Sequence, residues 1–319
     1  NKMKKLIFFT LVLSLVQGET IIVDQFGNGD YLTIQEGIYA AASYDTVLVM
    51  PGTYIESITI TSSDQSIYLT GINAASVQIW NSDHCFNIDF ANNVTIANFT
   101  ITSSSSSGIH ISADVTNNFN IINNIITDCS YSGIHIQNSG DWIEISNNII
   151  KDNGWSGLYH NSSMSNINIT NNVFYHNESS DIYATAGIVI ANNIIQSLPN
   201  NWSISMGGSN LQNSYNCVFG GTGWDNCAMG IGSITADPLL LDPSNNDFRL
   251  NYDDNSPCID AGNPTPLYND LDGSRNDMGT FGGSLSWYKT GPIVFDLLVS
   301  PTTIMQGDTI TIQATGSIE

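Results

Sequence analysis

A repeat of about two dozen residues is the strongest constraint in this sequence. Its marker is a double asparagine with start-to-start spacings of 24, 24 and 21 residues, at Asn123–Asn124, Asn147–Asn148, Asn171–Asn172 and Asn192–Asn193. Two positions before each pair lies an isoleucine, at Ile121, Ile145, Ile169 and Ile190. A fixed period of this length indicates a stacked architecture, in which no single unit can bury its apolar face alone.

Each unit holds three short runs rich in Ile and Val that alternate with period two, as strands do. The first run recurs at residues 109–111, 134–136, 158–160 and 182–184. None of the runs is long enough for a helix. The pattern predicts an all-β, single-stranded, right-handed parallel β-helix, with equivalent residues of successive coils roughly 4.8 Å apart. The column Asn98, Asn123, Asn147, Asn171 and Asn192 is predicted to form a side-chain ladder at one corner, because asparagine tolerates left-handed turns and its amide can bond its copy one coil away.

The ends of the chain differ from the repeats. Residues 1–18 have the basic start, apolar stretch and small cleavage residues of a secretory signal peptide, so the protein is expected to be secreted or displayed on a cell surface. Residues 19–290 are assigned to the β-helix with its caps. The N-terminal cap is predicted as a helix over residues 34–42, a strand at 47–49 and a turn at 51–54. Residues 291–319 read as the start of an immunoglobulin-like β-sandwich.

Charge and cysteine content exclude several classes of function. The chain carries 7 basic and 29 acidic residues, a net charge of −22. Removing the leader with its three lysines leaves a charge of about −25, which disfavours nucleic acid and anionic membranes. No segment is predicted to insert into a membrane, and a monomer is expected. Five cysteines make no disulfide framework. Cys217 and Cys227 flank a glycine-rich loop and are a candidate pair; the alternative is that all five are small buried residues.

Two segments resemble a known family. Residues 24–36, Asp-Gln-Phe-Gly-Asn-Gly-Asp-Tyr-Leu-Thr-Ile-Gln-Glu, together with Pro-Gly-Thr-Tyr-Ile-Glu at 51–56, resemble the opening of pectin methylesterases and other pectin-lyase-like β-helix proteins. Residues 256–262 and 270–279 resemble the closing segment of many secreted bacterial β-helix proteins. The resemblance implies a groove for saccharide on one outer face, along the first strand of each coil. The arginine, histidine and aspartate motifs of the pectin-active enzymes are missing, so no catalytic residue carries over from them.

The repeat register predicts which side chains line that face. The outward position of the first strand is occupied in successive coils by Asn87, His110, His135, Tyr159 and Tyr183. The preceding loops add Tyr131 and Trp155. Aromatic faces beside polar groups are what a saccharide groove needs, so His110, Tyr131, Trp155, Tyr159 and Tyr183 are the predicted substrate-binding set. The alternative is that such residues merely suit a half-exposed sheet.

Candidate catalytic groups lie beside this stripe. Asp128 and Asp152 occupy equivalent positions one coil apart, where they could share a proton or hold Ca²⁺, or simply cap their own turns. Lys151 and His135 are the candidate bases for a lyase. A polysaccharide lyase or a glycoside hydrolase is the reaction class expected if the protein is an enzyme.

A second cluster of carboxylates lies near the end of the chain. Asp270, Asp272 and Asp277 surround Gly273 in the manner of a calcium loop, although the distal Glu of an EF-hand is missing; a structural role is the alternative. Taken together, these features predict a protein that engages extracellular polysaccharide, by binding or by catalysis. The rival hypothesis is a structural or adhesive surface scaffold without an active site.

Overall fold

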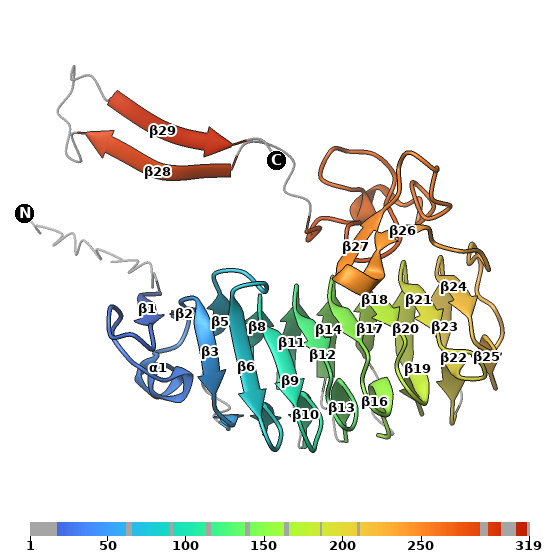
Figure 1. The fold of residues 1–319 in the computed structure, drawn as a ribbon, viewed down its shortest axis with the longest axis horizontal. Helices are drawn as coiled ribbons and strands as arrows, with labels where there is room; N and C mark the ends of the chain where they lie inside the picture. The colour runs from blue at the N-terminus through green and yellow to red at the C-terminus, as the bar shows by residue number, and fades with distance from the viewer. Residues whose placement is uncertain are drawn as a thin grey trace, which may run out of the picture.

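The structure is a computed structural model of the chain. It describes residues 18–61, 66–89, 92–112, 116–137, 141–162, 166–185, 187–208, 211–287, 293–300 and 311–317. The strands stack into three parallel sheets that run the length of the molecule, as Figure 1 shows. We call the three sheets A, B and C. In every coil the chain passes from sheet C to sheet A and then to sheet B. The parallel β-helix predicted from the repeat is therefore confirmed.

Within the described residues, each of the three sheets consists of eight or nine short strands. Sheet A contains β1 (Thr20–Val23), β2 (Thr46–Val49), β5 (Tyr68–Gly71), β8 (Thr95–Ala97), β11 (Thr116–Ile122), β14 (Asp141–Ser146), β17 (Ile167–Thr170), β20 (Ile188–Ala191) and β23 (Gln212–Ser214). Sheet B contains β3 (Gly52–Ile55), β6 (Val77–Asn81), β9 (Thr100–Ser103), β12 (Ile125–Thr127), β15 (Ile149–Lys151), β18 (Val173–Tyr175), β21 (Ile194–Ser197) and β24 (Cys217–Gly220). Sheet C contains β4 (Ile58–Ile60), β7 (Phe86–Ile88), β10 (Ile109–Ile111), β13 (Ile134–Ile136), β16 (Ser156–His160), β19 (Ser180–Ala184), β22 (Trp202–Met206) and β25 (Trp224–Asp225).

Stacked isoleucine columns form the core inside the coils. In sheet C, Ile109 pairs with Ile134, and Leu158 continues the column to Ile182. All four side chains are fully buried. Because side chains alternate across a strand, the residues between these inward positions point away from the core. The register predicted from the repeat is confirmed for this sheet.

The asparagine ladder lies one residue away from the predicted column. Asn124 Nδ2 donates to Asn148 Oδ1 at 3.1 Å, and the same bond repeats at 3.0 Å in each of the next three coils. The members are Asn124, Asn148, Asn172, Asn193 and Asn216. Each carboxamide oxygen also accepts the main-chain N–H of the residue one coil earlier. The ladder thus satisfies buried polar groups at the corner between sheets A and B.

The predicted column has a different role. Asn98, Asn123, Asn147, Asn171 and Asn192 all adopt left-handed backbone conformations, with φ between 54° and 62°. Asparagine is favoured in this conformation, so the first Asn of each pair makes the turn and the second makes the ladder. The prediction was correct about the turn and wrong about which column forms the ladder.

The N-terminal cap is the short helix α1 (Ile34–Ala40), two residues shorter than predicted. Thr33 and Glu36 form a capping box at its start, and the Glu56 carboxylate accepts the N–H groups of Ile34 and Gln35. These bonds attach the helix to the first coil. Residues 51–54, predicted as a turn, mostly belong to strand β3, because Gly52–Ile55 pairs in register with β6.

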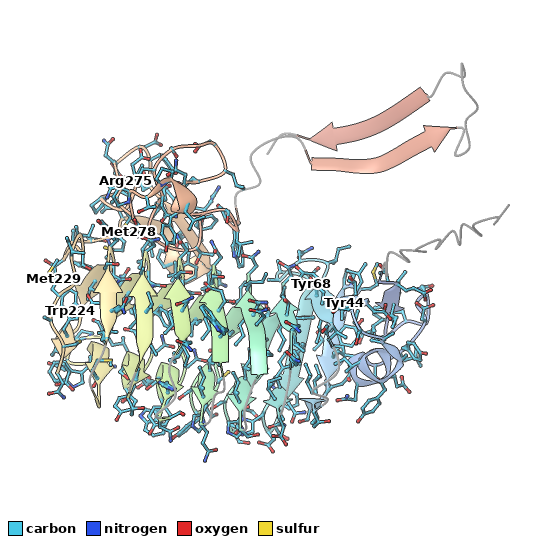
Figure 2. All side chains as sticks on the ribbon, turned by 180° about the vertical axis from the view of Figure 1, so that it is seen from behind. Tyr44, Tyr68, Trp224, Met229, Arg275 and Met278 are labelled. Atoms are coloured by element: carbon cyan, nitrogen blue, oxygen red, sulfur yellow. The ribbon has the colours of Figure 1, made fainter. Side chains whose placement is uncertain are left out.

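The C-terminal segment does not close the end of the stack, as the sequence suggested, but lies along sheet B. It contains β26 (Leu240–Asp242), β27 (Asp247–Leu250) and two 3₁₀ turns, Pro243–Asn245 and Pro266–Tyr268. A second apolar cluster joins it to outward residues of sheet B, and consists of Ile149, Val173, Ile194, Cys217, Phe248, Leu250, Cys258 and Met278. Figure 2 shows Met278 against the coils and Arg275 farther out.

Hydrogen bonds secure this segment to the predicted asparagine column. Asn147 Nδ2 donates to the carbonyl oxygens of Thr280 and Gly282 at 2.9 and 2.8 Å. The Trp287 indole donates to the Asn147 carbonyl oxygen at 2.6 Å. The C-terminal segment therefore covers the outer face of sheet B over these coils.

Other predictions about the ends have different outcomes. The predicted signal peptide lies outside the described residues, except for Gly18. The strands β28 (Ile293–Ser300) and β29 (Thr311–Ser317) form an antiparallel pair, and the immunoglobulin-like sandwich stays a prediction. No helix in the described ranges is long and apolar enough to cross a bilayer.

All five cysteines are free thiols, so the candidate pair of Cys217 and Cys227 is wrong. The Cys217 thiol is buried against the C-terminal segment and donates to the Ala236 carbonyl oxygen, whereas the Cys227 thiol donates to Ile204 in sheet C. The two thiols therefore belong to different packing environments.

We expect Asn148→Leu to destabilise the fold by about 3 kcal/mol, because it leaves buried donors and acceptors on two neighbouring coils without partners. Urea unfolding measures this change. The matched control is Asn245→Leu, at an exposed site where the change is expected to stay within about 0.5 kcal/mol. Equal losses for the two variants would contradict the ladder.

His160 makes the acid sensitivity of the core testable. Its ring is fully buried in the column between Ile136 and Ala184, and neither ring nitrogen has a hydrogen-bond partner among the described residues. Burial lowers the pKa of His160 from 6.5 to about 4. The unfolded chain therefore binds this proton first as the pH falls, so stability is lost below pH 6.5 and the loss levels off below pH 4.

We expect His160→Leu to remove this loss, which amounts to about 3 kcal/mol at pH 4 relative to pH 7.5. The measurement is the free energy of unfolding of the wild type and the variant between pH 7.5 and 4. Since other titrating groups are common to both proteins, the difference between the two curves isolates His160. Parallel curves would rule out its contribution.

Candidate functional site

A continuous stack of rings runs along the outer face of sheet C. His110 and His135 lie at outward positions of β10 and β13, and Tyr159 and Tyr183 continue the row on β16 and β19. Their ring centroids are separated by 4.9, 5.2 and 5.0 Å in order. These distances match the spacing of neighbouring strands, so the β-helix register itself sets the stack. We call this row, together with His84 described below, the sheet C stripe.

Two aromatic residues from the loops before the strands broaden the stripe. The Trp155 indole is stacked on Tyr159 at 4.8 Å with an interplanar angle of 25°. Tyr131 meets Trp155 edge-on at 4.1 Å and approaches His135 at 5.9 Å. Trp155, Tyr159 and His135 therefore converge, instead of pointing apart as a featureless face would require. The structure brings together the whole predicted substrate-binding set.

A hollow of about 330 Å³ opens at the C-terminal end of the stripe. Trp155, Tyr159, Tyr183 and Trp202 supply its aromatic wall. Its polar side chains are those of Ser179, Ser205 and Asp225, whereas the lining residues Ser156 and Ser180 are buried and their hydroxyls bond each other at 3.0 Å. The Ser205 hydroxyl donates to Asp225 Oδ2 at 2.8 Å, which orients the carboxylate. The hollow thus combines flat apolar faces with hydroxyl and carboxylate groups.

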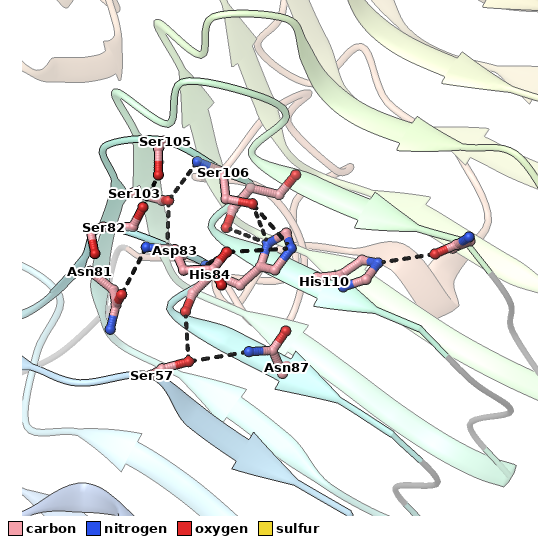
Figure 3. A network of polar contacts seen from close by, with 12 residues as sticks. Ser57, Asn81, Ser82, Asp83, His84, Asn87, Ser103, Ser105, Ser106 and His110 are labelled. Carbon is pink, nitrogen blue, oxygen red and sulfur yellow. Dashed lines mark hydrogen bonds and ion pairs between the residues drawn. The ribbon is translucent and has the colours of Figure 1, made fainter.

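The N-terminal end of the stripe is held by a polar network, shown in Figure 3. The His84 ring stacks on His110 at 4.4 Å and extends the row by one ring. Its Nδ1 lies 3.1 Å from the Ser107 carbonyl oxygen, and the Ser106 hydroxyl contacts the same ring. His110 Nε2 lies 3.4 Å from Gln137 Oε1. These contacts fix the orientation of the imidazoles.

The imidazoles of His110 and His135 are neutral at pH 7. Burial, reinforced by the neighbouring rings of His110 and His84, lowers the pKa of His135 from 6.5 to about 4. Burial and the His84 ring also lower the pKa of His110. At neutral pH these rings therefore present apolar faces and a free nitrogen lone pair, not positive charge.

The candidate catalytic carboxylates do not face the stripe as a pair. Asp128 and Asp152 are exposed and lie in left-handed turn conformations after strands of sheet B, with φ of 54° and 52°. Asp128 accepts the Thr127 hydroxyl at 2.7 Å, and Asp152 accepts the Lys151 ammonium at 2.6 Å. Lys151 lies in register with Tyr175, whose ring packs on Phe248 of the C-terminal segment. Of the four predicted catalytic residues, only His135 belongs to the stripe.

Three residues of this face were missed by the sequence analysis. Trp202 and Asp225 lie in coils that lack the double asparagine at the corner between sheets A and B, so the repeat register could not be extended to them from the sequence. His84 comes two residues before its strand, β7, and the outward position of that strand is occupied by Asn87. Asp181 is fully buried and accepts the Asn177 amide and the Ser197 hydroxyl. Burial raises the pKa of Asp181 to about 7, and the residue cannot contact a ligand.

The candidate calcium loop accepts hydrogen bonds from its own segment. Asp277 accepts the Asp260 N–H and the Tyr252 hydroxyl, and Asp270 accepts the N–H groups of Asp277 and Gly283. Asp272 accepts both donors of Ser274. No group of three or more His, Cys, Asp or Glu side chains suited to a metal ion occurs within the described ranges. Calcium binding at Asp270, Asp272 and Asp277 stays a prediction.

Comparison with known proteins identifies the fold. The family described as "right handed beta helix region" matches residues 36–219. Among solved structures, pectate lyase Pel9A is 16% identical with a TM-score of 0.51, over 85% of this chain and 98% of its own. A pectin methylesterase in complex with a hexasaccharide is 12% identical with a TM-score of 0.45, over 64% of this chain and 80% of its own. No curated protein matches the sequence. Since the family covers more than half of the chain, this protein belongs to the right-handed β-helix family and has the pectin-lyase-like architecture.

Proposed function

We propose that the protein engages extracellular polysaccharide. In this proposal the polysaccharide lies along the sheet C stripe and places one of its sugar units in the hollow beside Trp155. The observation that carries this proposal is the unbroken row of rings from His84 to Tyr183, flanked by Tyr131 and Trp155. A row of this kind offers a polymer several equivalent stacking positions, one on each coil.

The polar groups of the hollow support a saccharide more than an apolar ligand. A pyranose has flat C–H faces and a rim of hydroxyl groups. Tyr159 and Trp155 offer stacking surfaces, while Ser179, Ser205 and Asp225 offer hydrogen-bonding partners around them. The pectate lyase that shares this fold is named for a polysaccharide substrate, which is consistent with the same ligand class.

Binding without turnover is the form of this function that the geometry favours. The hollow has one carboxylate in its lining, Asp225, whereas glycoside hydrolysis ordinarily uses two. Lys151 is held by Asp152 on another sheet and is not available as a base beside the stripe. Secretion, expected from the leader, would place such a binding protein where polysaccharide occurs.

A lyase reaction is the second candidate, because His135 is a neutral imidazole within the stripe. In this reaction His135 would take the proton beside a uronate carboxylate. The rival of a different class is an adhesive scaffold in which the rings only stabilise the sheet. Substitutions in the stripe separate the three hypotheses, because they affect affinity, turnover and folding differently.

Binding is tested with Trp155→Ala and Tyr159→Ala. We expect each variant to bind about tenfold more weakly to the polysaccharide that the wild type retains, since each loses one stacking surface. Affinity electrophoresis in gels that contain polygalacturonate, xylan or mixed-linkage β-glucan measures the change. The control is Trp80→Ala, an exposed tryptophan on sheet B. Unchanged retention in both stripe variants would place the site elsewhere.

Catalysis is tested by the pH dependence of polygalacturonate cleavage. If His135 is the base, turnover rises with pH through about 4 and is constant near pH 7, because the ring must be unprotonated. His135→Gln should abolish the absorbance of the unsaturated product and leave retention on the gel within about twofold. If the wild type forms no product from any uronate polymer, the protein acts by binding alone.

A further inference from the structure

Sheet A carries an exposed tryptophan at a position that the repeat reserves for a turn residue. The residue before the first inward position of each sheet A strand adopts a left-handed conformation in five successive coils. The column consists of Asn93, Asn118, Trp142, Asn166 and Gly187, with φ of 52°, 47°, 63°, 90° and 49°. Asparagine and glycine suit this conformation, and tryptophan does not.

Trp142 gains little stability in return for this conformation. A left-handed conformation costs a bulky residue about 1–2 kcal/mol. The side chain is 56% exposed, so it does not bury most of its apolar surface. It also interrupts a row of amides, since Asn118 Nδ2 bonds Asn93 Oδ1 at 3.2 Å on the preceding coils. An aromatic residue held in a strained, exposed position suggests a role in contact with a ligand.

The surface beside Trp142 is hollowed on both sides. One depression of about 210 Å³ is lined by Asn118, Asn120, Glu144 and Asn168, and a larger one of about 640 Å³ by Asn166, Asn168, Val189 and Gln212. Trp142 contributes to both, so the indole stands between two adjoining depressions. The register of sheet A aligns Asn120, Glu144, Asn168, Val189 and Gln212 as one outward column across these coils.

The chemistry of this lining defines the ligand. Carboxamides donate and accept hydrogen bonds at once, which suits sugar hydroxyls, and the indole offers a stacking face. Glu144 supplies the only acidic group of the two linings. Its Oε1 accepts the Thr170 hydroxyl at 2.7 Å, and this bond orients the carboxylate. Neither lining includes Lys, Arg or His, so a uronate would meet a carboxylate with no cation beside it.

We propose that Trp142, with the carboxamides and Glu144 of sheet A, forms a second glycan-binding surface that takes an uncharged polysaccharide. This surface lies on a different sheet from the sheet C stripe and does not depend on the function proposed for it. A polymer that crosses several coils would place one sugar on the indole and hydroxyls of its neighbours against Asn120, Asn168 and Gln212.

The test compares Trp142→Asn with the wild type in affinity electrophoresis on xylan, mixed-linkage β-glucan, galactomannan and polygalacturonate. Asparagine is the residue that other coils use here, so the melting temperature of the variant should be no lower than that of the wild type. We expect retention on at least one uncharged polysaccharide to weaken about tenfold, while any retention on polygalacturonate is unchanged.

Trp155→Ala and Trp142→Asn, compared side by side, assign the two surfaces separately. If Trp142→Asn weakens retention and Trp155→Ala does not, the sheet A surface is supported and the function proposed for the stripe fails. If Trp155→Ala weakens retention and Trp142→Asn has no effect on any uncharged polysaccharide, the sheet A surface is overturned. Failure of the wild type to bind any uncharged polysaccharide overturns it too. A shift in sedimentation from dimer to monomer on Trp142→Asn would overturn it in favour of self-association.

Discussion

The carboxamide ladder from Asn124 to Asn216 is the interaction on which the other features of this protein depend. Each amide bonds the next coil through its side chain and the main chain of the preceding coil through its oxygen, so one coil cannot slip relative to another without breaking buried bonds. Exact stacking of coils converts a repeat in sequence into columns in space. The isoleucine core and the row of rings on sheet C are both consequences of that register.

The outer faces of the three sheets differ in their surroundings because their outward residues differ in polarity. Sheet B presents Ile149, Val173 and Ile194, which the C-terminal segment covers with Phe248 and Met278. Sheet C presents imidazole and phenol rings, and sheet A presents amides around Trp142. Burying the apolar face leaves the two faces whose groups can exchange water for sugar hydroxyls. Both proposals therefore follow from the same distribution of surface residues.

Positively charged side chains contribute little to either surface. The net charge of the sequence is −22. The three basic residues in the described part of the chain are engaged: Lys151 by Asp152, Arg249 by Asp247, and Arg275 by the carbonyl oxygens of Gly262 and Ala261. His110 and His135 are neutral because burial lowers their pKa values. Recognition at both faces would thus rely on stacking and on hydrogen bonds to hydroxyl, amide and carboxylate groups, the carboxylates being those of Asp225 and Glu144.

The sequence by itself determined the coil, the inward columns and the members of the stripe from His110 to Tyr183, because a period-two strand pattern repeated at fixed spacing leaves one register. It did not determine which asparagine of each pair enters the corner, since both suit a turn and only the left-handed backbone of Asn147 distinguishes it from Asn148. Only the tertiary structure placed the C-terminal segment on sheet B and stacked His84 on His110. Each of those contacts has one partner outside the repeat, where no periodicity records which parts of the chain meet.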